Sequence, residues 1–396
     1  MRVLVLSHKP PYPIVDGGCL AMSRFLLDLH EIDQIEKIDY VTFSTHKHPF
    51  KQEDYDSLNL EKASFKGLEL DTKIKVLPAL YSLITHESYH TKRFLNKRIS
   101  DTLLEMLSNT RYDFIVFESL YAAIYTPIVR KVFQGKILYR SHNIEHKIWE
   151  GLAKNQGNPL KRWYLQQLTK SLKKEEYAIW NQVDAILSIS KEDTAFIQQK
   201  TQKKVNYLPS SMPSNELQMN WSSNRMCFIG AFDWEPNMEA VQWFIKDVLP
   251  TIKQQIPELE FHIAGRKSER IPEEWRQDQV KIHGFVEDPL AFIAENGLFV
   301  ACLQSGSGIK MKVLEAMSIG APCVLTTKAA EGLELSKHMP IHEDAESFAL
   351  DIIELLQDQS KQQLRGALGK QFISSEFSTQ MVKDILEKDL QAMASI

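Results

Sequence analysis

The sequence predicts a two-domain α/β protein in which each domain is a doubly wound parallel sheet covered by helices on both faces. Three observations lead there. The chain has 396 residues, which exceeds what one hydrophobic core usually holds. Apolar, β-rich runs alternate with helical patterns in two successive series. Between the series, Tyr207–Arg225 is rich in Ser, Pro and Asn and has no clear period, which is typical of a linker.

The predicted strands are short and almost continuously apolar, as expected for parallel strands buried on both faces. In the first half they are Val3–Ser7, Ile38–Ser44, Ile74–Leu77, Phe114–Glu118, Lys136–Arg140 and Ala185–Ser190. In the second half they are Met226–Ile229, Leu259–Ala264, Val280–His283, Leu298–Cys302 and Pro322–Thr326.

These strands define the expected domain boundaries. An amino-terminal domain spans residues 1–206, a linker spans 207–225, and a carboxyl-terminal domain spans 226–377. Residues 378–396 read as a final amphipathic helix, which we expect to pack back toward the amino-terminal domain.

Composition narrows the class of protein. No apolar run approaches the roughly 20 residues that a membrane-spanning helix needs. The amino terminus reads better as a first strand than as a signal peptide. The four cysteines lie far apart without metal-ligand spacing, which predicts buried free thiols in a reducing cytoplasm.

Charge is unevenly divided between the halves. Residues 1–210 hold 30 Lys and Arg against 24 Asp and Glu, a balance of +6, and the remainder holds 17 against 27, a balance of −10. Much of the positive charge falls in the longest helical pattern, Glu145–Asn181, where lysines interleave with Trp and Leu. This pattern fits a solvated helix face, or a surface that meets anionic lipid or a phosphorylated acceptor.

The segment Ser305–Thr327, SGSGIKMKVLEAMSIGAPCVLTT, combines a bare loop, two lysines and one carboxylate. It follows a predicted strand, so its loop lies where α/β sheets bind ligands. Backbone amides around Gly306, Ser307 and Gly308, with a helix start near Ile309, suit an anion. Lys310 and Lys312 add positive charge, and Glu315 can accept hydrogen bonds from ribose hydroxyls. A nucleotide diphosphate meets these demands, although a glycine-rich turn before an exposed helix explains the spacing equally well.

A second glycine pair occupies the corresponding place in the first half. Gly17 and Gly18 open an amphipathic helix after the first strand, without the G-x-G-x-x-G spacing of a dinucleotide fingerprint. Two such elements could face each other across a cleft between the domains.

With these motifs in place, the chain resembles a glycosyltransferase of the GT-B fold, close to family 4, over essentially its whole length. The resemblance rests on Gly17-Gly18, RSHNIEHKIW at Arg140–Trp149, FIGAFDWEPN at Phe228–Asn237, HGFVED at His283–Asp288 and GSGIKMKVLEAMSIGAP at Gly306–Pro322. The last is the most specific, because its LEAM-x-x-G-x-P ending is the family's donor-site signature.

The resemblance implies transfer of a sugar from a nucleotide diphosphate sugar to an acceptor hydroxyl, with retained anomeric configuration. It implies two facing Rossmann-like domains, the carboxyl-terminal one holding the donor, and neither a metal nor another cofactor. The expected acceptor is a saccharide or lipid-linked saccharide of bacterial surface polysaccharide or glycolipid assembly. We expect a cytoplasmic protein in peripheral contact with the inner face of the membrane, and no nucleic-acid partner.

The resemblance also assigns roles to residues, with two departures. Glu315 matches the ribose-binding glutamate of the family's Glu-x7-Glu motif, but the first glutamate is replaced by Ser307. Gly230 is followed by Ala231, and Pro236 stands near the place of a lysine, so two phosphate-binding cations of that loop are missing. A buried diphosphate without cations is costly, so we predict that Lys312 serves the phosphate and Lys310 the loop or the sugar.

In the first domain, His142 and Asn143 follow a predicted strand and are expected to contact the donor sugar or the acceptor. Arg140 is either a contact of this kind or a structural pairing residue, and Glu145 either orients His142 or caps the helix. No carboxylate stands out as a nucleophile, which fits a front-face displacement in which the leaving diphosphate takes the acceptor's proton. Two alternatives are a nucleotide-sugar epimerase on the same fold and a non-catalytic nucleotide-sugar-binding protein.

Overall fold

The computed structural model describes residues 1–75, 78, 81–82, 85 and 87–394. The chain divides into two compact units. The first unit comprises Met1–Ser210 with Val382–Ile396, and the second comprises Ser211–Met381. Both are parallel α/β sheets, so the predicted fold class is confirmed at this level.

The first unit is built on a seven-stranded sheet with the order β3-β2-β1-β4-β5-β6-β7, and every pairing is parallel. Its strands are β1 (Arg2–Ser7), β2 (Lys37–Ser44), β3 (Ala63–Glu69), β4 (Phe114–Glu118), β5 (Lys136–Ser141), β6 (Ala185–Ser188) and β7 (Lys204–Tyr207). The central strands β1, β4, β5 and β6 are buried along almost their full length, because helices cover both faces of the sheet.

The helices of this unit are α1 (Gly17–His30), α2 (Glu53–Asp56), α4 (Tyr89–Lys92), α5 (Lys97–Asn109), α6 (Leu120–Ala123), α7 (Thr126–Val129), α8 (Glu145–Asn155), α9 (Pro159–Gln182) and α10 (Lys191–Gln198). The final helix, α17 (Thr379–Ala394), belongs to this unit from Val382 onward. There Asn206 Nδ2 donates to Asp389 Oδ1 over 2.6 Å, which ties the helix to the end of β7.

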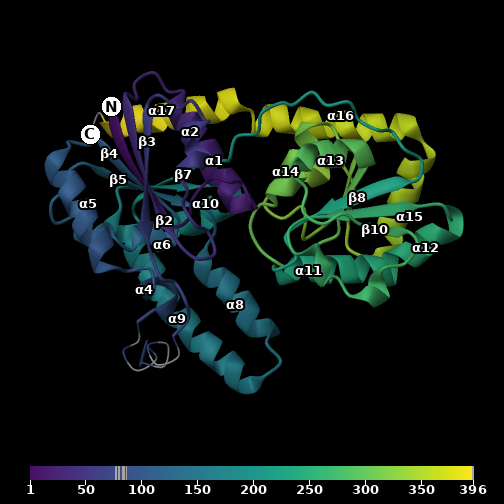
Figure 1. Cartoon of the computed structure of the whole chain (residues 1–396), viewed down its shortest axis with the longest axis horizontal. Coiled ribbons are helices and arrows are strands. Elements are labelled where there is room, and N and C mark those ends of the chain that lie inside the picture. The colour runs from purple at the N-terminus through teal and green to yellow at the C-terminus, as the bar shows by residue number, and fades with distance from the viewer. Residues whose placement is uncertain (76–77, 79–80, 83–84, 86, 395–396) are drawn as a thin grey trace. The chain divides into compact units, whose positions relative to one another are not determined.

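The second unit has a six-stranded parallel sheet with the order β10-β9-β8-β11-β12-β13. Its strands are β8 (Arg225–Ile229), β9 (Glu260–Ala264), β10 (Val280–Ile282), β11 (Leu298–Ala301), β12 (Cys323–Thr326) and β13 (Ile341–His342). Its helices are α11 (Glu235–Trp243), α12 (Leu249–Gln255), α13 (Pro289–Asn296), α14 (Met311–Ser318), α15 (Ala345–Gln357) and α16 (Gln359–Glu376), and a π-helical segment at Phe244–Val248 joins α11 to α12. Figure 1 shows the sheet of each unit between its helices.

Two expectations about elements are wrong. The strand at the edge of the first sheet beside β2 is β3, whereas the sequence predicted Ile74–Leu77 as a strand. Ile74 and Lys75 belong to no strand, and residues 76–77 lie outside the described part of the chain. The helical pattern Glu145–Asn181 is two helices, because Asn158 accepts hydrogen bonds from the amides of Leu160 and Lys161 and caps a new helix with Pro159 in its first turn.

All four cysteines are buried and free, as predicted. Within the described residues, no helix combines the length and apolar character needed to cross a bilayer.

Candidate functional site

Each sheet has one point at which the strand order reverses. In the first unit β1 lies between β2 and β4, and in the second β8 lies between β9 and β11. At such a point the loops after the two neighbouring strands turn to opposite faces of the sheet and leave a crevice beyond their carboxyl ends. The predicted site residues of each unit gather at these ends.

In the second unit, the carboxyl edge of the sheet is lined by glycines that tolerate no side chain. A Cβ on Gly230, directly after β8, would lie 2.8 Å from Asn237 Cγ, and one on Gly265, directly after β9, would lie 1.9 Å from the Gly230 carbonyl oxygen. After β11, Gly306 and Gly308 adopt φ angles of 98° and 76°, which L side chains rarely accept. Backbone is therefore the surface that a ligand meets here.

The Lys312 ammonium lies at the carboxyl end of β8. It donates to the Ile229 carbonyl over 3.0 Å and to Asn237 Oδ1 over 2.8 Å, and it lies 4.0 Å from the centre of the Phe228 ring. Lys312 thus projects from α14 to the loop that begins at Gly230. That loop is where the resemblance places the two missing cations.

Burial lowers the pKa of Lys312 from 10.5 to about 7, with a further small contribution from Lys310. The folded chain therefore releases this proton near neutral pH, whereas the unfolded chain keeps it until about pH 10.5. The charged lysine costs folding free energy at low pH, and that cost is relieved as the pH rises from about 7 toward 10.

We accordingly expect the free energy of unfolding to rise with pH above 7, relative to Lys312→Met, by up to about 1.4 kcal/mol per pH unit. Urea unfolding of both proteins at several pH values between 6 and 9 measures this difference. Lys246→Met removes an exposed lysine and serves as the control. A pH-independent difference between wild type and Lys312→Met would contradict the lowered pKa.

Lys310 has different partners. It is the amino-terminal cap residue of α14, and its Nζ donates to the Gly308 carbonyl and pairs with Glu331 Oε2 at 3.3 Å. The helix begins two residues later than the predicted start near Ile309. Lys310 therefore braces the glycine-rich loop, and the carboxylate of Glu331, shared with Lys328 at 2.7 Å, neutralises much of its charge.

Glu315 shares a helix face with Lys312, because residues three apart on a helix are neighbours. The other residues of α14 around them are buried against the unit, and these two remain partly exposed. No side chain caps the first turn of α14, nor that of α11, which begins after β8. Lys312 of α14 thus lies beside the first turn of α11, where Asn237 accepts its hydrogen bond, at the carboxyl end of β8.

Sequence reasoning overlooked Arg266, which follows Gly265 at the end of β9. Its Nη2 donates to Asp233 Oδ1 over 3.1 Å, and its carbonyl accepts from the Phe232 amide over 2.8 Å. The loop after β8 is therefore fastened to a second cation. An arginine placed two residues beyond an apolar strand, in the run EFHIAGR, was the available signal.

In the first unit, the structure surrounds His142 with buried charge. Glu118 ends β4 and is fully buried, and its Oε2 contacts both His142 Nε2 and, at 3.2 Å, Arg140 Nη1. Arg140 also donates to Ser210 Oγ over 3.2 Å and lies 4.6 Å from the Phe25 ring centre. Arg140 is therefore a structural pairing residue. Burial lowers the pKa of His142, while Glu118 opposes that effect, so the ring is neutral near pH 7.

The sequence did not indicate that Glu118 contacts His142. Glu145, which was considered for this role, has a different partner. The Glu145 carboxylate accepts from the Tyr121 hydroxyl over 2.9 Å, and burial, together with nearby Glu176, raises its pKa to about 7. Asn143, the other predicted contact, is partly exposed, and its carbonyl accepts from Ser141 Oγ over 3.1 Å.

The neighbouring strand end carries a second histidine. His8 follows β1, and its Nδ1 lies 2.8 Å from Ser119 Oγ, whose backbone has the unusual φ of 85°. Burial lowers the pKa of His8 well below its usual value. Together with His142, this residue places two neutral imidazoles beyond β1 and β5, on either side of β4.

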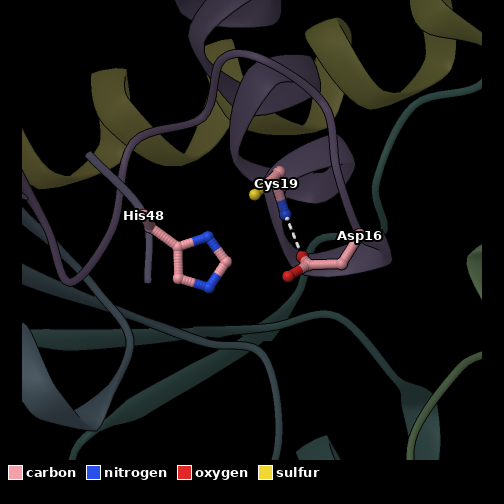
Figure 2. Close-up of side chains that lie close together, drawn as sticks. All are labelled: Asp16, Cys19 and His48. Atoms are coloured by element: carbon pink, nitrogen blue, oxygen red, sulfur yellow. Dashed lines mark hydrogen bonds between the residues drawn. The ribbon is translucent and has the colours of Figure 1, made fainter. Parts of the chain in front are cut away.

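The glycine pair begins α1, as predicted, and the residues around it include three potential metal ligands. Ligand atoms of Asp16, Cys19 and His48 all lie within 4.8 Å of one another. Figure 2 shows the three side chains beside the start of α1. Asp16, however, accepts from the Cys19 amide over 2.9 Å and receives Lys9 Nζ on both oxygens at 2.6 and 2.7 Å. Burial raises the pKa of Cys19 to about 11, so its thiol stays protonated. The lysine already neutralises this carboxylate, and the donor set fits a capped helix better than a dication.

Comparison with known proteins locates the family signal in the second unit. Residues 223–358 match the family model described as "Glycosyl transferases group 1". This match lies within the second unit, Ser211–Met381. The matched segment contains the glycine-lined edge, Lys312 and Glu315. A protein described as an uncharacterized 44.6 kDa protein in the cps region of Klebsiella pneumoniae is 24% identical over 373 residues, covering 89% of this chain and 90% of that protein.

Solved structures match both units of the chain. HepE from Anabaena, determined in complex with UDP-glucose, covers 99% of this chain and all of its own, with a TM-score of 0.66 at 12% identity. TarM from Staphylococcus aureus, in a complex that includes UDP, matches with a TM-score of 0.66 at 12% identity over 99% of both chains. Sucrose-phosphate synthase from Thermosynechococcus elongatus matches with a TM-score of 0.69 at 14% identity over the whole of both chains. At these identities the likeness establishes the shared GT-B fold.

Proposed function

We propose that this protein is a glycosyltransferase that moves a sugar from a nucleotide diphosphate sugar to an acceptor hydroxyl. The observation that carries the proposal is the Lys312 ammonium at the carboxyl end of β8, within a group 1 domain whose sheet edge is bare backbone. The lysine and the backbone amides there suit the phosphates of a nucleotide diphosphate, and the Glu315 carboxylate suits its ribose hydroxyls. HepE and TarM were determined with UDP-glucose and UDP respectively, so UDP-sugars are the first donors to test.

In the proposed reaction the donor diphosphate lies against the glycine-rich edge. Amides at the starts of α11 and α14 and the Lys312 ammonium stabilise the charge that develops on the leaving diphosphate. Arg266 supplies further positive potential through the loop after β8. The diphosphate itself takes the acceptor's proton on the face from which it leaves, so configuration is retained, and no protein nucleophile or metal ion takes part.

The identity of the sugar depends on Ser307. A serine hydroxyl is shorter and uncharged compared with the glutamate that the resemblance expects, so it cannot offer two charged oxygens to a pair of sugar hydroxyls at this place. We propose a saccharide or lipid-linked saccharide acceptor in surface polysaccharide assembly, and the relative from a cps region supports the polysaccharide role alone.

A panel of nucleotide diphosphates and their sugars tests the donor assignment. A ligand that binds only the folded protein raises its melting temperature, so the matching nucleotide should stand out in thermal-shift measurements. Incubation of the matching sugar donor with and without saccharide acceptors then separates the activities. Turnover without an acceptor would identify an epimerase, and binding without any turnover would favour a non-catalytic nucleotide-sugar-binding protein.

Glu315→Ala should weaken nucleotide binding by roughly 1–3 kcal/mol, because it leaves ribose hydroxyls unpaired. Isothermal titration calorimetry with the matching nucleotide measures the loss. Glu295→Ala removes an exposed glutamate from α13 and should bind as tightly as the wild type. Equal affinities for the wild type and Glu315→Ala would show that Glu315 does not bind the ribose.

A further inference from the structure

The turn between α8 and α9 forms a surface that the donor site does not use. The two helices run antiparallel from the sheet to a shared turn at residues 156–158 (Figure 1). We call residues 151–163, which include this turn, the hairpin tip. Seven consecutive residues of the tip, 157–163, are exposed.

The base of the same hairpin is firmly packed. In α9, Leu172, Ile179 and Trp180 belong to the core of the first unit, and Leu168 packs with Tyr89. The exposed tip is thus the end of a well-anchored helix pair and not a loose loop. Its position is set by the core beneath it.

The tip exposes large apolar side chains. Leu160 is 79% exposed, Trp163 is 55% exposed and Leu152 is 45% exposed. They lie on the last turns of α8 and the first turns of α9, so the three gather around one turn. Exposed apolar side chains that gather in this way mark a surface that meets another molecule.

The charge around these side chains has a single sign. Residues 151–174 contain Lys154, Lys161, Arg162, Lys170, Lys173 and Lys174 and not one Asp or Glu. Six positive charges in this stretch equal the whole excess of residues 1–210. Glu150, directly before the tip, pairs with Lys173 at 3.6 Å, and Glu175 and Glu176 follow the stretch. The apolar tip is therefore bordered by a stretch of net positive charge that includes Lys154, Lys161 and Arg162.

We infer that the hairpin tip docks on an anionic lipid bilayer. Trp and Leu side chains enter the interface between headgroups and acyl chains, where amphipathic indole rings are favoured. Lys161 and Arg162, in the same helical turn, then meet lipid phosphates, and the lysines farther along α9 add long-range attraction. A nucleic acid would account for the charge but not for exposed leucines, and an acidic protein would not require a protruding tip.

Sedimentation of the full-length protein with vesicles tests this inference. Vesicles of phosphatidylcholine with about one third phosphatidylglycerol should bind the protein, and binding should fall steeply as salt is raised, because exposed charges are screened within about 10 Å at 0.1 M. Lys161→Gln/Arg162→Gln should weaken binding at least tenfold. Leu160→Ser should weaken it severalfold while preserving the salt dependence.

The chain offers matched controls. Lys97 and Arg98 form the corresponding exposed pair in the first turn of α5, and Leu364 is 62% exposed in the second unit. Lys97→Gln/Arg98→Gln and Leu364→Ser should bind vesicles as the wild type does. Equal loss in these controls, or equal binding to anionic and neutral vesicles, would overturn the docking of the tip. Nucleotide affinity, measured without vesicles, should be unchanged in every tip variant, so this test stands apart from the test of the donor site.

Discussion

Lys312→Met should lower the turnover rate at least tenfold. Negative charge on the diphosphate grows toward the transition state, so an ammonium at this place stabilises the transition state more than the bound donor. A tenfold loss corresponds to about 1.4 kcal/mol, which is modest for one charge-assisted contact. Steady-state kinetics with the matching donor and a working acceptor measures the effect, and kcat should fall more than KM rises.

Lys310→Met is the matched comparison, because it removes a neighbouring lysine of the same helix start. Its charge already meets Glu331, and Lys328 remains to neutralise that carboxylate when Lys310 is gone. We expect a small loss of activity from this change. Full activity in both variants would show that the donor charge is neutralised elsewhere, and Arg266→Met would then be the next variant to measure.

The lowered pKa of Lys312 gives the same hypothesis a second readout. At pH 8 the free protein holds this amine largely neutral, since its pKa is about 7. A diphosphate beside it favours the charged form and raises that pKa, so donor binding should take up close to one proton. Calorimetry in buffers of different ionisation enthalpy counts the proton. Lys312→Met should take up none.

The fold was largely predictable because parallel strands buried on both faces leave a plain mark in the sequence. Runs such as Phe114–Phe117 and Leu298–Ala301 are apolar throughout, since helices cover both sides. The edge strand β3, ASFKGLE, has side chains that alternate between partly buried and exposed positions, so the more apolar run at Ile74–Leu77 was mistaken for it. Edges are where the hydrophobic pattern weakens.

The second-unit site was predictable from local sequence, because its loop, lysines and glutamate are consecutive in the chain. The first-unit site was not, because Glu118 and His142 are 24 residues apart and meet only when β4 pairs with β5. An acidic residue at the end of an apolar strand was the sole hint. Pairing across a sheet is long-range information that no local pattern contains.

Glu118 and His142 carry the other large expected effect. Glu118→Gln leaves the Arg140 guanidinium, which is 1% exposed, without its carboxylate. Loss of one partner of a buried ion pair costs about 3–5 kcal/mol, so the midpoint of urea denaturation should drop sharply. Glu36→Gln, at an exposed carboxylate of the same unit, is the control and should leave the midpoint almost unchanged.

The orientation of the His142 ring follows from the same contact. A carboxylate only accepts hydrogen bonds, so Nε2 carries the ring proton and donates a hydrogen bond to Glu118. In the neutral ring, Nδ1 is then left as an acceptor. We expect Nδ1 to accept a hydrogen bond from a sugar or acceptor hydroxyl. Glu118 is then a positioning residue that fixes the tautomer.

Two substitutions at His142 separate the two nitrogens. Glutamine places its amide near Nε2, so His142→Gln should keep the contact with Glu118 and the wild-type stability but lose roughly 10- to 100-fold in kcat/KM, because a hydroxyl of the substrate is left unpaired. Asparagine places its amide near Nδ1, so His142→Asn should lose stability and retain more of the activity. If both variants are unstable yet fully active per folded molecule, His142 serves the Glu118–Arg140 cluster alone. The hydroxyl contact must then come from another residue at this sheet edge. His8, which contacts Ser119 after β4, would be the first candidate.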